Sequence, residues 1–209
     1  MEIITEKKRA GSYIVREIDG LSRDLVTVLS GQNLPTARVV GNSFAAVAAP
    51  SGANTGDGAA GAVTIGDHAE EGVYALTCVS AAANAGVFTV SMPGGGMLHD
   101  LTVGVEYLSP HINLTLADGA ADFVIGDVIT ITLSVAGVVG CDPDAVDGSQ
   151  KAAGVLYDGV DATAAAKTGV ITARLSSVRV SDLVWADNAT PADILSGMAS
   201  LADAGIFAR

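Results

Sequence analysis

The chain has few charged side chains, and across its middle it has no basic ones at all. Of its 209 residues 16% are charged, with 11 Lys and Arg against 23 Asp and Glu. Residues 50–140 hold nine carboxylates and no Lys or Arg. A stretch of a single negative sign repels phosphate groups, so the sequence argues against nucleic acid as a direct partner.

The chain also lacks an apolar run long enough to span a membrane, which takes about 20 residues. Its mean hydropathy is nevertheless +0.45, and 49% of its residues are hydrophobic. We therefore expect apolar surface to be buried between the subunits of an assembly. No apolar segment follows the basic residues 7–9, so we expect no signal peptide, no membrane partner and synthesis in the cytoplasm.

Aromatic residues are scarce, at 4% of the chain, whereas glycine is abundant, with 25 residues. Small aliphatic residues together with many turn formers are typical of a β-rich protein and argue against a coiled coil or a disordered chain. The only two cysteines, Cys78 and Cys141, match no zinc or redox spacing. We predict that both are free thiols.

Runs of β-branched and aromatic residues alternate with Gly, Asp or Asn turns in the middle of the chain. In residues 87–92 and 112–116 apolar and polar side chains alternate, as in a strand with one buried face. Six such runs predict a small all-β sandwich or barrel. The runs are residues 62–65, 73–79, 87–92, 101–108, 112–116 and 128–135.

The composition on either side suggests that this β domain is inserted into another one. Residues 45–61 are rich in Ala, Gly, Ser and Pro and are interpreted as a linker. We expect residues 1–20 to form an extended arm, and residues 21–49 with 141–209 to form a discontinuous core. The inserted all-β domain is placed at residues 56–137.

The last sixty residues carry the clearest helix signal in the chain. Thr190 followed by Pro191 and Asp193 is typical of a helix start, and Gly205 of the residue after a helix end. Strands are predicted at residues 152–156 and 170–175. The predicted fold class is thus mainly β with one short C-terminal helix: a small β-rich α+β core interrupted by an all-β, sandwich-like or barrel-like insert.

No arrangement of residues predicts catalysis or a bound cofactor. The Gly56–Gly61 string matches G-x-G-x-x-G, but no strand precedes it and no helix follows it. The acidic loop Asp142–Asp147 lacks the spacing of a calcium loop, although calcium binding there stays open beside the alternative of a solvated loop. We predict no catalytic residues, no metal ligands and no cofactor, and we interpret three histidines as surface residues: His68, His99 and His111.

Two segments of the chain carry recognisable motifs. Residues 21–41 begin with LSRD and end with VVG, and residues 149–209 contain GVLYDGVDAT, LVW and a terminal AGI followed by Arg209. Together and in this order they resemble the lambda-type head decoration proteins of tailed bacteriophages, over less than half of the chain. The motif residues of the core are Ser22, Arg23, Asp24, Gly154, Tyr157, Asp161, Thr163, Trp185 and Gly205.

The resemblance implies a structural protein and not an enzyme. Such a protein would bind the outside of the expanded head as a homotrimer at three-fold and quasi-three-fold positions, with the major capsid protein as partner, and would stabilise the head against DNA pressure. Trp185 would then pack in the core or in the trimer interface.

The N-terminal arm is the predicted capsid-binding element, because β-forming residues can add a strand to an exposed sheet edge. Apolar and polar contacts are assigned to Ile3, Ile4, Thr5 and Tyr13, and contacts with acidic capsid surface to Lys7, Lys8 and Arg9. The alternative is a disordered tail.

A second function stays open for the insert. The insert is the part by which this chain differs from minimal family members. The alternative function is that of an outward-facing virion module that recognises a host surface or glycan through the insert. Its few aromatic residues argue against a sugar site, which usually needs a stacking ring; those available are Tyr74, Phe88, Tyr107 and Phe123.

Overall fold

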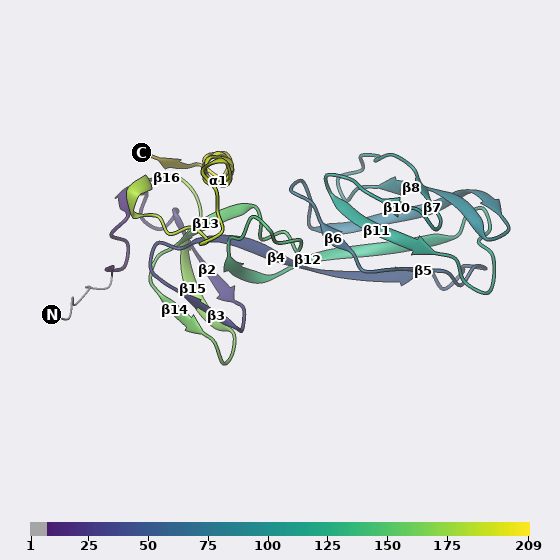
Figure 1. Cartoon of the computed structure of the whole chain (residues 1–209), viewed down its shortest axis with the longest axis horizontal. Coiled ribbons are helices and arrows are strands. Elements are labelled where there is room, and N and C mark those ends of the chain that lie inside the picture. The colour runs from purple at the N-terminus through teal and green to yellow at the C-terminus, as the bar shows by residue number, and fades with distance from the viewer. Residues whose placement is uncertain (1–7) are drawn as a thin grey trace. The chain divides into compact units, whose positions relative to one another are not determined.

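The computed structural model describes residues 8–209 and is mainly β, with one α-helix near the C-terminus (Figure 1). The predicted fold class is confirmed. The chain divides into two compact units: unit 1 holds the residues up to Ser43 together with Ala136–Arg209, and unit 2 holds Phe44–Val135. Strands β4 (Val39–Pro50) and β12 (Val128–Gly140) each begin in one unit and end in the other, so they are the two connections between the units.

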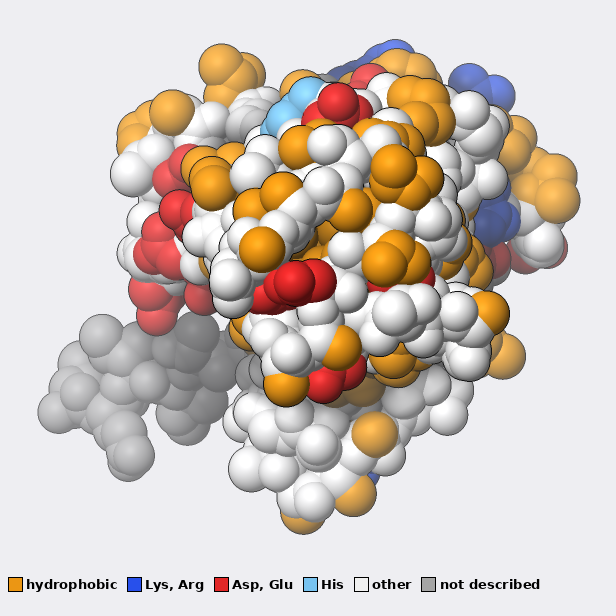
Figure 2. Space-filling model, turned by 90° about the vertical axis from the view of Figure 1, so that its right-hand side faces the viewer, with side chains coloured by type: hydrophobic (Ala, Val, Ile, Leu, Met, Phe, Trp, Pro, Cys, Tyr) orange, Lys and Arg blue, Asp and Glu red, His pale blue; other side chains and the backbone are white. Residues whose placement is uncertain are grey.

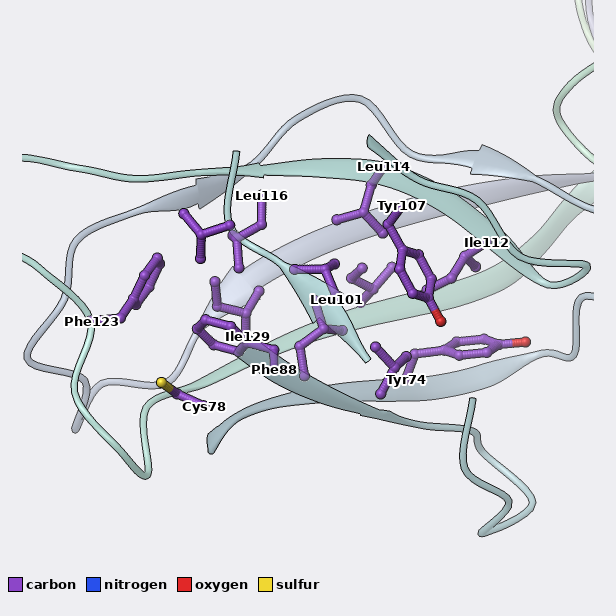
Figure 3. Packing of buried hydrophobic residues seen from close by; sticks show 14 of the residues in the cluster. Tyr74, Cys78, Phe88, Leu101, Tyr107, Ile112, Leu114, Leu116, Phe123 and Ile129 are labelled. Carbon is purple, nitrogen blue, oxygen red and sulfur yellow. The ribbon is translucent and has the colours of Figure 1, made fainter. Parts of the chain in front are cut away.

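Unit 2 consists of antiparallel strands around one hydrophobic core (Figure 3). One sheet has the order β12-β7-β8-β9, and in the other β11 pairs with β10, β5 and β6. Buried residues alternate with half-buried ones along β8 and with half-buried or exposed ones along β11, which confirms the alternation predicted for these two strands. The bounds are β5 Ala59–Ala60, β6 Thr64–Ile65, β7 Gly72–Ala82, β8 Ala85–Ser91, β9 Leu101–Thr102, β10 Glu106–Tyr107 and β11 Ile112–Ala117.

Two predictions for this part of the chain are wrong. The run 101–108 is not one strand, because Gly104 adopts a φ of +76° and turns the chain between β9 and β10. Residues 45–61 are not a free linker, because β4 continues to Pro50 and Gly56 and Gly58 lie against the buried ring of Phe123. A Cβ on Gly56 would sit 2.6 Å from that ring. The small residues allow close packing here and do not signal flexibility.

Unit 1 contains a sheet in which β2, β15, β13 and β4 follow one another, a three-stranded sheet β1-β16-β17, and a two-stranded ribbon of β3 and β14. The strand predicted at residues 170–175 occupies Lys167–Thr172 instead, and the segment between it and β13 contains the short strand β14. The bounds are β1 Ile14–Arg16, β2 Arg23–Val28, β3 Gln32–Leu34, β13 Ala152–Leu156, β14 Val160–Ala162, β15 Lys167–Thr172, β16 Ser176–Val178, the short 3₁₀ helix Val180–Asp182 and β17 Ile206–Ala208.

The predicted helix is confirmed as α1, Pro191–Asp203, and its first turn is closed by a capping box. The Asp193 backbone N–H donates to Thr190 Oγ1 at 3.3 Å, and the Thr190 backbone N–H donates to Asp193 Oδ2 at 2.9 Å. The φ of Gly205 is +81°, the left-handed conformation expected just beyond a helix. Within residues 8–209 no helix is long and apolar enough to span a membrane.

Both cysteines are buried free thiols, as predicted. Burial raises the pKa of the Cys141 thiol to about 11 and also raises the pKa of Cys78. Neither thiol therefore has the low pKa of a reactive nucleophile.

Candidate functional site

The basic N-terminal segment borders the folded part of unit 1. Ile3, Ile4, Thr5 and Lys7 lie outside the described residues. Lys8 and Arg9 are exposed, and the Lys8 ammonium donates to the backbone carbonyl of Asp182 at 2.5 Å. The described chain thus begins with two cationic side chains on the surface of unit 1.

Tyr13 is not a surface residue, which corrects its predicted role as a capsid contact. Its side chain is 0% exposed, and its hydroxyl donates to the carbonyl of Val155 at 3.0 Å and hydrogen bonds Thr172 Oγ1 at 2.6 Å. Burial raises its pKa. The following residues form β1, which pairs with β16, so the chain from Tyr13 onward belongs to the folded unit and not to an extended arm.

The charged residues of the first motif bind other parts of unit 1. The Arg23 guanidinium lies 3.8 Å above the ring centroid of Tyr157 and pairs with both carboxylate oxygens of Glu17. Asp24 pairs with Arg174, whose Nη1 also donates to the carbonyl of Leu21 at 3.0 Å. The two motifs therefore meet through a stacked cation and an ion pair.

The remaining motif residues also serve local structure. Ser22 is 1% exposed and its hydroxyl donates to the carbonyl of Leu175 at 2.9 Å. A Cβ on Gly154 would lie 2.8 Å from the carbonyl oxygen of Thr172, so only glycine fits there. Asp161 accepts hydrogen bonds from the Thr163 backbone N–H at 3.1 Å and hydroxyl at 2.6 Å, which lower its pKa.

Trp185 packs in the core of unit 1, one of its two predicted places. It lies against the cluster that contains Leu201 and Ile206, and its ring covers Gly197 of α1, where a Cβ would come within 2.7 Å of Cη2. The motif thus specifies how unit 1 folds. It does not by itself mark a binding surface.

A groove in unit 1 went unrecognised in the sequence. It has a volume of about 630 Å³, and its lining combines cationic, anionic and apolar groups. Thr36 Oγ1 links its two sides, because it accepts the Gly159 N–H at 3.0 Å and donates to Asp158 Oδ1 at 3.2 Å. Lining residues include Lys8, Asn33, Leu34, Thr36, Asp158 and Asp161.

The acidic loop after β12 is hydrogen-bonded to the side-chain amide of Asn188. Nδ2 of Asn188 donates to Asp142 Oδ1 at 2.9 Å and to Asp144 Oδ2 at 2.8 Å, and the first of these bonds lowers the pKa of Asp142. Between residues 8 and 209 no three His, Cys, Asp or Glu side chains are arranged to hold a metal ion.

Unit 2 carries the three histidines and, besides Phe44, the four aromatic side chains considered for a sugar site. The His99 ring stacks on Tyr107 with centroids 4.5 Å apart, and His111 Nδ1 lies 3.4 Å from the Tyr74 hydroxyl. All four aromatic rings are buried, with exposed fractions of 3% or less: Tyr74, Phe88, Tyr107 and Phe123 (Figure 3).

Residues 8–209 thus define a β-rich protein whose described part begins with two exposed cationic side chains. A family model described as Bacteriophage lambda head decoration protein D matches residues 111–206. The predicted resemblance is confirmed: the chain is similar to a structural phage head decoration family, which is not enzymatic and which implies association with a phage capsid. The match spans 96 of the 209 residues and includes the second motif up to Ile206, but not residues 21–41.

Comparison with solved structures gives a weak likeness. Two crystal structures of FlgL from Xanthomonas campestris, in space groups H3 and C2, have sequence identities of 15% and 16% and TM-scores of 0.34. The alignments cover 50% of this chain and 33% and 32% of FlgL, so the chain spans about a third of the FlgL length. A likeness of this degree defines neither fold nor function. No curated protein sequence matches the chain.

Proposed function

We propose that this chain is a head decoration protein that binds the outside of an expanded phage capsid as a homotrimer. It sits at three-fold and quasi-three-fold positions, contacts the major capsid protein and stabilises the shell against the pressure of packaged DNA. The observation that carries the proposal is the family match across residues 111–206, which includes most of the second motif. Synthesis takes place in the host cytoplasm.

The physical argument is one of linkage. A ligand that binds the expanded lattice and not its precursor stabilises the expanded form by mass action, without catalysis. A trimer presents three copies of each contact, so weak contacts add up through avidity. Burial between protomers also accounts for exposed apolar side chains of unit 1, such as Leu25 at 77% and Phe207 at 57%.

The capsid contacts are assigned to the N-terminal segment that precedes Tyr13. Lys8 and Arg9 are exposed there, and Lys8 also lines the groove of unit 1. In this proposal the basic side chains meet acidic capsid surface, and the predicted contacts Ile3, Ile4, Thr5 and Lys7 precede them in the sequence. Tyr13 is left out because it is buried.

Two chain variants test this assignment on purified expanded capsids. Deletion of residues 2–8 leaves Tyr13 and β1 in place, so we expect an intact trimer by sedimentation equilibrium but loss of capsid retention. Lys8→Glu should weaken retention, whereas Lys151→Glu, which makes the same charge change at another exposed position of unit 1, should not. Unchanged retention after the deletion contradicts the assignment.

The second candidate function, glycan recognition by unit 2, has less support. Four of its five aromatic rings are buried and the fifth, Phe44, is half-buried against the same core, so within residues 44–135 no exposed Phe, Tyr or Trp is present to stack on a sugar. Recognition of a protein does not need a stacking ring and depends instead on the other exposed side chains of unit 2.

A further inference from the structure

One end of unit 2 exposes apolar side chains on neighbouring segments, called here the loop end: residues 79–85, where β7 ends and turns into β8, and the loops 103–105 and 118–126. Hydrogen bonds join these loops to one another and to adjacent strands: Gly126 N–H donates to the carbonyl of Cys78, and Val103 N–H to that of Gly86, both at 2.9 Å. The exposed fractions are 45% for Val79, 56% for Val105, 41% for Val124 and 70% for Ile125. Figure 2 faces this end and shows hydrophobic side chains with carboxylates between them.

The loop that presents Val124 and Ile125 is fixed by hydrogen bonds to a buried carboxylate. The buried carboxylate of Asp127 accepts backbone N–H bonds from Val124 at 3.0 Å and from Thr55 and Gly56 at 2.9 Å. Although burial alone would raise the pKa of Asp127, these three bonds lower it.

The buried ring of Phe123 adds support from the core, because it packs edge-on against Phe88 at 4.9 Å. The exposed side chains therefore stand on an ordered base. Little conformational entropy would be lost when a partner covers them.

The charge of the unit limits what that partner can be. Residues 44–135 hold nine carboxylates and no Lys or Arg. Asp57, Asp118 and Asp122 belong to the loop end or contact it: Asp57 accepts from Ala121 N–H at 2.8 Å, and Asp122 from Asn84 N–H at 2.8 Å. A second copy of this surface, a nucleic acid or an anionic membrane would all be repelled.

Asp118 adds a second observation. Its Oδ1 is buried and has no hydrogen-bond partner among the described residues. A buried carboxylate oxygen without a donor is costly, so Asp118 leaves an unused acceptor within the loop end.

We propose that the loop end is a docking surface for a protein partner that presents an apolar face bordered by Lys or Arg side chains, such as an amphipathic basic helix. Ile125 and the valines around it would pack on the apolar face, and the aspartates would pair with the basic border. The proposal concerns unit 2 alone and does not depend on capsid binding by unit 1.

The test uses the full-length protein, labelled with ¹⁵N, and a synthetic amphipathic helical peptide of Lys and Leu as the probe. We expect amide shifts confined to the loop end, and binding by titration calorimetry that Ile125→Asp weakens about tenfold or more. Met97→Asp is the matched control, since Met97 is 61% exposed in the turn after β8, at the other end of that strand. It should bind as the wild type does.

Three outcomes overturn the proposal. Equal affinity of Ile125→Asp and the wild type for the peptide would show that Ile125 makes no apolar contact with it. Equal binding of a Lys and Ser peptide of the same charge would reduce the surface to general electrostatics. Binding to phosphatidylglycerol vesicles as tight as binding to the peptide would point to a membrane partner instead.

Discussion

Replacement of Tyr13 tests whether the chain is already part of the folded unit at this position. In Tyr13→Phe the ring stays and only the hydroxyl is lost, which removes the hydrogen bonds that it makes with Thr172 Oγ1 and the carbonyl of Val155 in a fully buried place. We expect a loss of about 1–3 kcal/mol in the free energy of unfolding. Tyr13→Ala also removes the ring from the core, and should cost about 3–5 kcal/mol.

The assay is urea unfolding at fixed protein concentration, with the change in midpoint converted through the slope of the unfolding curve. A residue of an extended arm would contribute nothing in this experiment. If Tyr13→Ala changes the free energy of unfolding by less than about 0.5 kcal/mol, as an ordinary surface substitution does, the placement of Tyr13 is refuted.

The same side chain predicts a dependence on alkaline pH. Burial raises the pKa of Tyr13 above its ordinary value of 10.0, so its contribution is complete below pH 10 and is lost as the pH rises further. The wild type should lose stability more steeply than Tyr13→Phe above pH 10, by about 1.4 kcal/mol per pH unit. Parallel curves for the two proteins would contradict the assignment.

The remaining predictions concern four other buried residues. Gly197→Ala should destabilise the protein by about 1–3 kcal/mol despite the better helix propensity of alanine, because the added Cβ meets Trp185. The control is Ser196→Ala, which changes an exposed residue and should leave the free energy of unfolding unchanged. Urea unfolding monitored by Trp185 fluorescence measures both variants. Cys78 and Cys141 should not react with a thiol reagent at pH 8 until urea unfolds the chain; rapid labelling of either would contradict their burial. Asp127→Asn should cost at least about 1.5 kcal/mol at neutral pH. Since the pKa of Asp127 lies below its ordinary 3.8, this difference should shrink as the pH falls below that value; a constant difference would contradict the three-bond arrangement.

Local signals were sufficient for α1 and for several strands of unit 2. The Thr190 and Asp193 capping pair lies within four residues, and the alternation in β8 and β11 follows from one buried face of a sheet. Such patterns act over short distances along the chain, so the sequence alone predicts them.

The wrong predictions concern positions whose burial depends on residues far away in the sequence. Nothing near Tyr13 shows that its ring will be buried, because its hydrogen-bond partners are Val155 and Thr172. Likewise, the composition around Gly56 and Gly58 is typical of a flexible linker, and only the packing of Phe123 against them shows that the segment is ordered.

The candidate sites show the same division. The motif residues were recognised by their order in the sequence, but their role in holding unit 1 together emerged only from contacts such as Arg23 on Tyr157. The groove joins residues 33–36 to residues 158–161, and the loop end of unit 2 joins three separate loops. Surfaces assembled from distant segments leave no pattern of spacing to find.

The decoration account is tested most directly by sedimentation of the purified protein alone and with expanded, undecorated capsids. We predict co-sedimentation that saturates near one copy per coat subunit, with no binding to unexpanded shells. Failure to bind expanded capsids at any protein concentration would contradict the account.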